Sequence, residues 1–343
     1  MLDNYKREII FLLVAMLIIF TSSLYRSEYI SNITDISSEV KNNVKSVVSV
    51  LKEDSDTGNL RNIGSAVAVK KENDIVYLVT SLHVVDEDVG YFIKEHSGEV
   101  SKVDILGKDE STDLAVIYCK KDIPLVEIRA SDTLKLGESI FSIGSPFGLN
   151  ESISTGVISG LHRSVTNKLE VGDNLKYSLV DVIQTDAVLN PGNSGGGLFD
   201  VDGKLVGITN AIYSDSGRDQ GISFAVRTEM IENVVNDLLK QGYVSHPYIG
   251  VSVIDLNDSI REEFGYSSYN GVIIADLYND KSDFQIGDII SKIENREVYD
   301  VDEFLLIILQ SEIGDELKVE VYRDGKIQNV YIKVLERPVD EDN

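Results

Sequence analysis

The sequence predicts a mainly β protein with two folded parts behind an apolar N-terminal segment, on three observations. Between residues 45 and 225, many short β-branched runs are broken by Gly, Asn and Asp, which is typical of all-β architecture. After residue 226 the apolar spacing becomes helical, and β-type runs return beyond residue 245. A chain of 343 residues has room for two domains and accessory elements.

The apolar segment near the N-terminus predicts a membrane anchor. Residues 9–25 contain seventeen residues without a charge, near the lower limit of about 17 for a spanning helix. Lys6 and Arg7 precede the segment, so the positive-inside rule places residues 1–8 in the cytoplasm and the bulk of the chain outside it. A cleaved signal peptide is the competing interpretation. No small-x-small cleavage site follows the run, which favours an uncleaved single-pass anchor with residues 26–39 as a tether.

The run LNPGNSGGGL at residues 189–198 indicates a catalytic turn. Its serine, Ser194, lies between Gly192-Asn193 and three more glycines. Glycine reaches backbone conformations closed to other residues and allows another backbone to come close. A nucleophilic serine needs both, because nearby N–H groups must point at the oxygen that becomes negative during acyl transfer. An ordinary glycine-rich hairpin is the alternative interpretation of this segment alone.

A nucleophilic serine needs a base, and that base needs an orienting partner. His83 ends a β-branched run that begins at Ile75, where a histidine can reach a cleft. Asp113 comes directly before an apolar run, and a charge entering a buried strand is costly unless it is paired, for example with His83. Alone, Asp113 could equally be a turn residue. The order His83, Asp113, Ser194 is that of the chymotrypsin class.

Four motifs make the chain resemble a membrane-anchored HtrA/Deg serine protease, in which a trypsin-like domain is followed by one PDZ domain. They are TSLHVV at 80–85, TDLAV at 112–116, GSPFG at 144–148, and IQTDA at 183–187 with NPGNSGG at 190–196. The match spans about residues 40–335. The resemblance implies a chymotrypsin-like double β-barrel at residues 40–242 and a PDZ domain at 243–338. Residues 339–343 are expected to be a solvated acidic tail. It also implies a homotrimer held through the protease domains.

The resemblance also implies residue roles. Ser194 would be the nucleophile, His83 the general base and then acid, and Asp113 the group that fixes the imidazole tautomer. The backbone N–H groups of Gly192 and Ser194 would form the oxyanion hole, with Asn193 between them. Each such donor is worth about 3 kcal/mol of transition-state stabilisation. A flip of the turn that carries Gly192 would leave the hole unformed and would regulate activity.

Substrate preference follows from two further positions. Val188, six residues before Ser194, stands where enzymes that cut after Lys or Arg have an aspartate, so a basic residue would lack a counter-charge. The run Ile208-Thr209-Asn210 resembles the strand that pairs with substrate backbone, with Ile208 as a pocket wall. The usual family order is Ile-Asn-Thr, so Thr209-Asn210 is a departure. We expect small or medium aliphatic residues at the cleaved position.

The C-terminal part resembles a PDZ domain that binds C-terminal peptides. The loop that would receive the peptide carboxylate consists of Tyr248, Ile249, Gly250 and Val251. Asp300 and Glu303 form a predicted capping pair for a helix that ends at Leu309 and would flank the groove. Residues 276–284 are shorter than the usual loop and helix, so we expect only a turn there. A β-rich packing domain without a ligand is the alternative.

A helix is predicted between the two parts. Apolar residues recur at helical spacing over residues 227–240, and Gly242 suits a helix C-cap. This helix would close the protease domain and link it to the next one.

Composition excludes several other functions. The 57 Asp and Glu against 32 Lys and Arg give a formal net charge of −25, which argues against nucleic-acid binding and broad docking on anionic lipid. The single cysteine, Cys119, is predicted to be an inert core thiol. No Cys/His cluster or phosphate-binding glycine loop occurs, so we expect no metal and no cofactor. His96, His162 and His246 are interpreted as loop or structural residues.

Two function classes remain. The first is a membrane-tethered serine endopeptidase that cleaves misfolded or regulatory proteins outside the cytoplasm, with its PDZ domain sensing exposed C-termini. The alternative is a non-proteolytic PDZ-containing chaperone or peptide-binding sensor on the same fold. The complete set of serine, histidine, aspartate and oxyanion segment favours the first.

Overall fold

The computed structural model describes residues 16, 35–54, 57–87, 89–145, 152–171, 175–190, 192–212, 221–268, 270–278 and 283–338. Apart from Met16, the expected anchor at residues 9–25 lies outside this set, as do most of the tether and the acidic tail. Among the described residues, none of the helices has the length and apolar character needed to cross a membrane.

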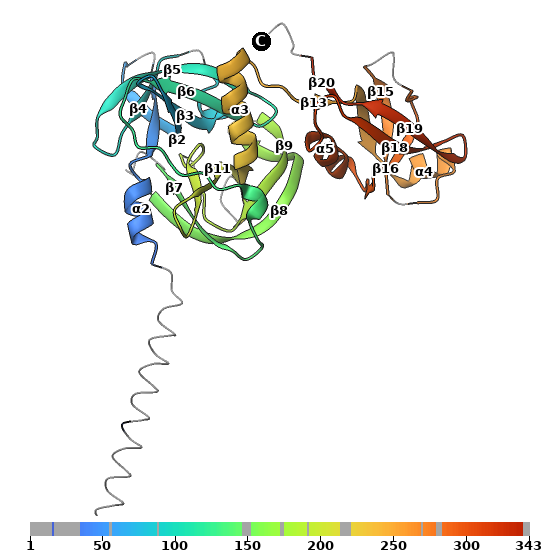
Figure 1. The fold of residues 1–343 in the computed structure, drawn as a ribbon, viewed down its shortest axis with the longest axis horizontal. Coiled ribbons are helices and arrows are strands. Elements are labelled where there is room, and N and C mark those ends of the chain that lie inside the picture. Colours follow the sequence, from blue (N-terminus) through green and yellow to red (C-terminus); the bar gives the residue numbers. More distant parts are fainter. Residues whose placement is uncertain are drawn as a thin grey trace, which may run out of the picture.

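The first part of the chain forms a closed antiparallel barrel with the strand order β1-β2-β3-β6-β5-β4 (Figure 1). A short helix, α2 (Ser37–Asn43), precedes it. The strands are β1 (Val47–Glu53), β2 (Leu60–Glu72), β3 (Ile75–Ser81), β4 (Tyr91–Lys94), β5 (Val100–Asp109) and β6 (Leu114–Cys119). A single turn of 3₁₀ helix, η1 (Leu82–Val84), follows β3, and a second, η2 (Ser131–Thr133), lies between the barrels in sequence.

A second closed barrel follows, with the order β10-β11-β12-β9-β8-β7. Its strands are β7 (Ser139–Gly144), β8 (Ser152–Val171), β9 (Leu175–Thr185), β10 (Gly197–Asp200), β11 (Leu205–Ile212) and β12 (Ser223–Arg227). The β-branched runs that predicted an all-β architecture are these strands, because branched side chains pack well on a pleated, half-buried surface. The predicted double barrel is therefore confirmed.

A hydrophobic cluster joins the two barrels. It contains Val79 and Leu114 of the first barrel together with Phe141 and Phe199 of the second, whose rings stack at 5.4 Å. Helix α3 (Thr228–Gln241) packs its apolar face on the same cluster, and Gly242 ends it with φ 85°. The predicted helix and its glycine cap are confirmed, and the helix crosses both barrels (Figure 1).

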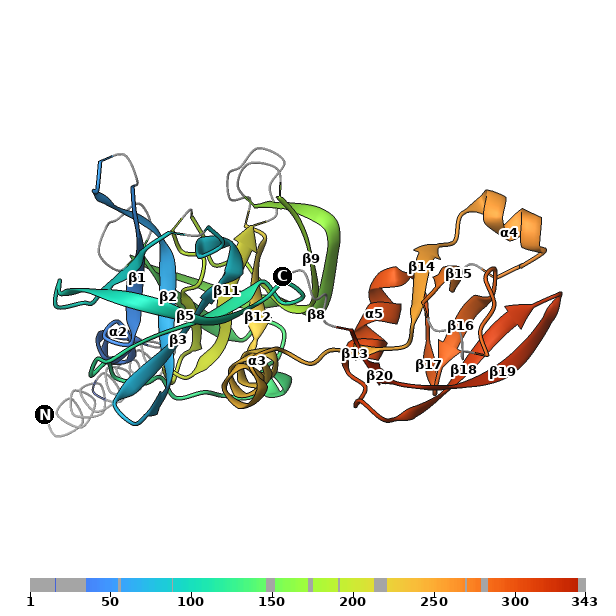
Figure 2. The same ribbon diagram turned by 90° about the horizontal axis from the view of Figure 1, so that it is seen from above.

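The C-terminal part is a separate sheet with its own core, visible beside the barrels in Figure 2. Its strand order is β14-β15-β16-β18-β19, with β17 paired to β16. These strands are β14 (Val251–Asp255), β15 (Val272–Leu277), β16 (Ile289–Ile293), β17 (Arg296–Glu297), β18 (Glu316–Arg323) and β19 (Lys326–Lys333). The two-residue strands β13 (Pro247–Tyr248) and β20 (Leu335–Glu336) pair with each other.

Two helices complete the described residues of this part. Helix α5 (Val301–Leu309) begins as predicted, because the Asp300 side chain accepts a hydrogen bond from the Glu303 N–H at 2.8 Å. Helix α4 (Asp258–Phe264) was not anticipated from the sequence. The described residues between β15 and β16 contain no helix, and residues 279–282 of the predicted turn lie outside the described set.

Candidate active site

His83 and Asp113 meet in the first barrel, where β3 and β6 run side by side. The His83 ring Nδ1 lies 2.6 Å from Asp113 Oδ2, and the His83 backbone N–H donates to Asp113 Oδ1 at 3.1 Å. Asp113 is fully buried, and its carbonyl accepts a third hydrogen bond, from the Leu82 N–H at 2.9 Å. The carboxylate therefore holds both the ring and the backbone of His83.

Ser194 joins this pair through Asn210 on β11. The Ser194 hydroxyl donates to the Asn210 carbonyl at 3.1 Å, and the Asn210 side-chain amide donates to the Asp113 carbonyl at 3.3 Å. Gly64 provides a second link, because a Cβ there would lie 2.6 Å from Val84 Cγ1 and 3.1 Å from the Ser194 carbonyl oxygen. The three residues predicted from the sequence are thus brought to one place between the barrels.

The backbone before Ser194 forms a tight turn. The Asn193 N–H donates to the Asn190 carbonyl at 2.9 Å, and Gly192 has φ 100°. A positive φ at the third position is the requirement of a type II turn, which glycine satisfies without strain. Gly195 is equally restricted, because it has φ 81° and a Cβ there would lie 2.1 Å from the Ser65 carbonyl oxygen.

Ser65 on β2 was missed in the sequence analysis. Its N–H donates to the Ser194 carbonyl at 2.9 Å, and its hydroxyl donates to the Gly192 carbonyl at 2.8 Å. The signal was a serine in the otherwise apolar run of residues 63–69. A buried strand position tolerates a hydroxyl only when the hydroxyl has a partner, and here that partner is the turn before Ser194.

The predicted specificity residues lie in contrasting environments. Val188 is 47% exposed, whereas Ile208 is fully buried in the cluster that joins the barrels. Thr209 and Asn210 are also buried, and their side chains contact the Ser194 turn and Asp113. The role of these four residues in substrate binding stays a prediction.

The predicted carboxylate-binding loop connects β13 to β14. Gly250 has φ 76°, and its carbonyl accepts a hydrogen bond from the Tyr278 N–H at 2.8 Å. Ile249 is buried in the core of the C-terminal part. Strand β14 is an edge strand of the sheet and α5 packs beside it, which is the arrangement in which a peptide adds a strand.

Two other histidines contact carboxylates away from this site. His162 Nδ1 lies 2.7 Å from Asp181 Oδ1, and His246 Nε2 lies 2.7 Å from Asp109 Oδ1. In the part of the chain that the structure describes, no group of three His, Cys, Asp or Glu is arranged to hold a metal ion.

Comparisons with known proteins agree with this architecture. Residues 64–208 match a trypsin-like peptidase domain, and residues 247–334 match a PDZ domain. A probable periplasmic serine endoprotease, DegP-like, from Marinomonas sp. (strain MWYL1) is 33% identical over 82% of this chain and 59% of its own length. A probable periplasmic serine protease, do/HhoA-like, from Haemophilus influenzae is 32% identical over 80% of this chain and 59% of its own. The solved structure of the HtrA-type protease AlgW with a tripeptide is 30% identical, covers 90% of this chain and 99% of its own, and has a TM-score of 0.70.

The fold and the site together define a two-barrel serine protease scaffold joined to a PDZ domain. The chain belongs to the HtrA-type protease family. It spans 59% of the length of the curated relatives described above.

We predict that Cys119 does not react with alkylating agents in the folded protein. Burial, with a smaller contribution from Glu95, raises the pKa of its thiol to about 11. Because the pKa is raised, only about one thiol in a thousand is ionised at pH 8, and the thiolate is the reactive form. Iodoacetamide at pH 8 should leave the native chain unlabelled by mass spectrometry and should label it fully in urea. Rapid labelling of the native chain would show that this strand opens or that the thiol is ionised.

Proposed function

We propose that this chain is a serine endopeptidase that works through an acyl-enzyme. The Ser194 hydroxyl attacks the carbonyl carbon of a peptide bond while His83 removes the hydroxyl proton. The tetrahedral intermediate collapses, the C–N bond breaks, and His83 gives the proton to the leaving amine. Water then attacks the ester by the same route and releases Ser194. The observation that carries this proposal is the 2.6 Å contact between His83 Nδ1 and Asp113 Oδ2 beside Ser194.

The proposed role of Asp113 is to fix the tautomer of His83 and to stabilise its charged form. The carboxylate contacts Nδ1, so Nε2 is the nitrogen that exchanges a proton with Ser194. The N–H groups of Gly192 and Ser194, with Asn193 between them, would receive the negative oxygen. The positive φ of Gly192 supports a formed turn, since a flipped turn would need a different φ there.

The same proposal includes a location and a class of substrate. Residues 9–25 would anchor the chain in the cell membrane, with residues 1–8 in the cytoplasm and the protease domain outside. Unfolded or regulatory proteins would be the substrates, and a homotrimer would be the assembly. The relatives named above carry the description periplasmic, which supports an extracytoplasmic site. The domain limits would be residues 40–242 for the protease and 243–338 for the PDZ domain.

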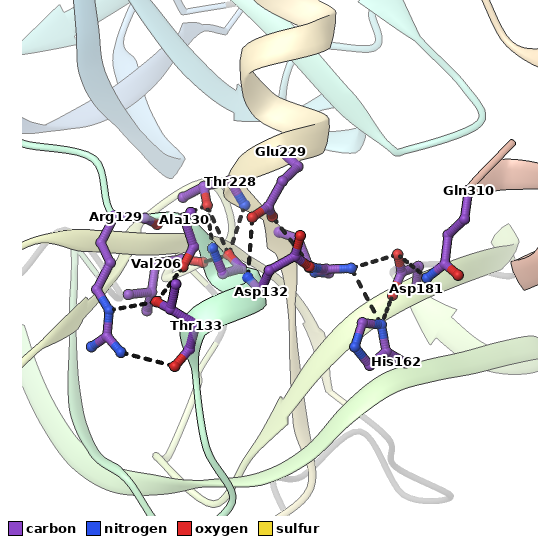
Figure 3. A network of polar contacts seen from close by, with 12 residues as sticks. Arg129, Ala130, Asp132, Thr133, His162, Asp181, Val206, Thr228, Glu229 and Gln310 are labelled. Atoms are coloured by element: carbon purple, nitrogen blue, oxygen red, sulfur yellow. Dashed lines mark hydrogen bonds and ion pairs between the residues drawn. The ribbon is translucent and has the colours of Figure 1, made fainter. Parts of the chain in front are cut away.

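We also propose that peptide binding to the PDZ domain regulates cleavage. Two contacts between the parts support this coupling. Gln310, directly after α5, donates to Asp181 Oδ2 at 3.4 Å, and Asp181 also contacts His162 (Figure 3). His246 in the connecting segment contacts Asp109, which accepts a hydrogen bond from the Thr112 hydroxyl next to Asp113.

Asp181, which accepts the first of these hydrogen bonds, is itself held in place by an ion pair. The Arg227 guanidinium donates to Asp181 Oδ2 at 2.6 Å, and both side chains are buried. Burial alone would lower the pKa of Arg227, but the charges of Asp181 and Glu229 outweigh it and raise that pKa. Arg227 therefore stays charged, and a movement of α5 would change the surroundings of the buried Asp181 side chain.

The full chain in detergent should digest unfolded casein, and Ser194→Ala should abolish digestion. Asp113→Asn should lower kcat about 10⁴-fold, because the amide cannot stabilise charged His83. His83→Ala should be as inactive as Ser194→Ala, whereas the matched control His96→Ala should keep its activity. Equal and negligible digestion by wild type and Ser194→Ala would reject the protease proposal in favour of a peptide-binding protein.

Cleavage should occur after small or medium aliphatic residues. On a panel of peptides that differ at one position, the wild type should cut after Ala or Val more efficiently than after Lys. The variant Val188→Asp should raise kcat/KM for the Lys peptide relative to the Val peptide, because it introduces a counter-charge. Mass spectrometry of the products checks both statements, and a wild type that prefers Lys would reject the assignment of Val188.

Peptides with a free apolar C-terminus should stimulate casein digestion. A coupling of this kind is typically about 5- to 150-fold. The same peptide with an amidated C-terminus is the control, because it lacks the carboxylate that the loop at residues 248–251 would bind. Gln310→Ala should reduce the difference between the casein digestion rates measured without and with the stimulating peptide. Identical rates with free, amidated and no peptide would exclude regulation through this loop.

A further inference from the structure

We infer that two buried hydroxyls, one from each barrel, position the backbone turn that holds the oxyanion. Ser65 on β2 holds the turn from the first barrel, and Thr209 on β11 holds it from the second. Both are positioning residues, since their hydroxyls contact the turn's carbonyls and not the reacting atoms. The inference rests on the proposed protease activity and assigns two residues that support it.

Ser65 fixes the peptide group between Gly192 and Asn193. Its hydroxyl donates to the Gly192 carbonyl at 2.8 Å, while the N–H of the same peptide group donates to Asn190 at 2.9 Å. A peptide group is planar, so a group held at both ends cannot rotate about its axis. These two contacts fix the orientation of the peptide group that follows the Gly192 α-carbon, where the backbone has a φ of 100°.

The hydrogen of the Ser65 hydroxyl has a defined direction. The oxygen accepts a hydrogen bond from the Ser145 N–H at 2.8 Å, so its hydrogen is directed at Gly192. The main chain of Ser65 is held as well, because its carbonyl accepts from the Thr80 hydroxyl at 2.7 Å. Ser65 is thus held in place by contacts with Ser145 and Thr80, in addition to its contact with the turn.

Thr209 fixes the next peptide group, between Asn193 and Ser194. Its hydroxyl donates to the Asn193 carbonyl at 2.7 Å, and the Gly196 N–H donates to the same oxygen at 2.8 Å. In a trans peptide the N–H points opposite to the carbonyl. Holding the Asn193 carbonyl therefore aims the Ser194 N–H away from the core, toward the position where the oxyanion would form.

The main chain of Thr209 is tied to the same turn. The Gly195 N–H donates to the Thr209 carbonyl at 2.7 Å, and the Thr209 N–H donates to Gly196 at 2.8 Å. Ser65 and Thr209 are both fully buried, so neither hydroxyl can exchange its partner for bulk water. Oxyanion stabilisation depends on N–H donors that are already oriented before the negative charge develops. The hydroxyls of Ser65 and Thr209 hold the turn that carries these donors in that orientation.

The test uses the full chain in detergent and a fluorogenic peptide taken from a casein site that the wild type cuts. Ser65→Ala and Thr209→Val remove the two hydroxyls, and Thr209→Ser restores the second. We expect kcat to fall about 10- to 100-fold in the first two variants with KM nearly unchanged, because misaimed donors affect the transition state. Thr209→Ser should recover most of the lost kcat.

Ser131→Ala is the matched control. The Ser131 hydroxyl is buried, donates to the Val206 carbonyl at 2.6 Å and accepts from the Thr228 N–H at 3.0 Å, yet it lies outside the candidate site. It should lose stability in urea to a similar degree as Ser65→Ala and keep its kcat. This comparison separates a positioning effect from general loosening of the fold.

A peptide aldehyde supplies a second readout, because its hemiacetal oxygen would occupy the oxyanion hole. Ser65→Ala and Thr209→Val should bind the aldehyde at least 10-fold more weakly, while binding of the matching cleaved product peptide should be unchanged. The inference is overturned if the wild type is active but these variants lose no more kcat than Ser131→Ala. If wild type and Ser194→Ala are equally inactive, the protease proposal itself fails.

Discussion

The structure depends on the contact between the two barrels at the backbone of Ser194. The Ser65 N–H on the first barrel donates to the Ser194 carbonyl, and the Gly195 N–H donates to Thr209 on the second. The segment that carries Ser194 is therefore hydrogen-bonded to both of the closed sheets. Because Asp113 and His83 belong to the first barrel, this link also sets the position of Ser194 relative to them.

The hydrophobic cluster that joins the barrels supports this link but contributes no polar side chain to the site. Phe141 and Phe199 stack in the cluster that joins the barrels, and α3 packs on the same cluster. Well-packed interiors resist small displacements. The connection to the C-terminal part includes polar contacts at Asp181 and Asp109.

Much of this arrangement could be predicted from the sequence. β-Branched runs broken by glycine, asparagine and aspartate predicted the all-β architecture, and helical spacing predicted α3 and its glycine cap, because these signals are local. The double barrel was implied by the resemblance to HtrA/Deg proteases. His83, Asp113 and Ser194 could be proposed because each residue type has a distinct chemistry. Ser65 was missed, because a serine in an apolar strand signals that its hydroxyl has a partner but does not say whether that partner is the Ser194 turn or a neighbouring strand. Helix α4 was missed because its seven residues show little apolar periodicity.

Asp113 has φ 52°, a left-handed conformation that few residues besides glycine, asparagine and aspartate adopt readily. The bend turns the chain into β6 and brings the carbonyl of Asp113 to the Leu82 N–H. The residue at this position must therefore meet two requirements. It must adopt a left-handed main-chain conformation, and its side chain must carry a negative charge. An asparagine at this position would keep the main-chain conformation, because it adopts φ > 0 as readily, and would remove the charge beside His83. The outline of the fold is therefore a poor guide to whether a relative retains the charged group.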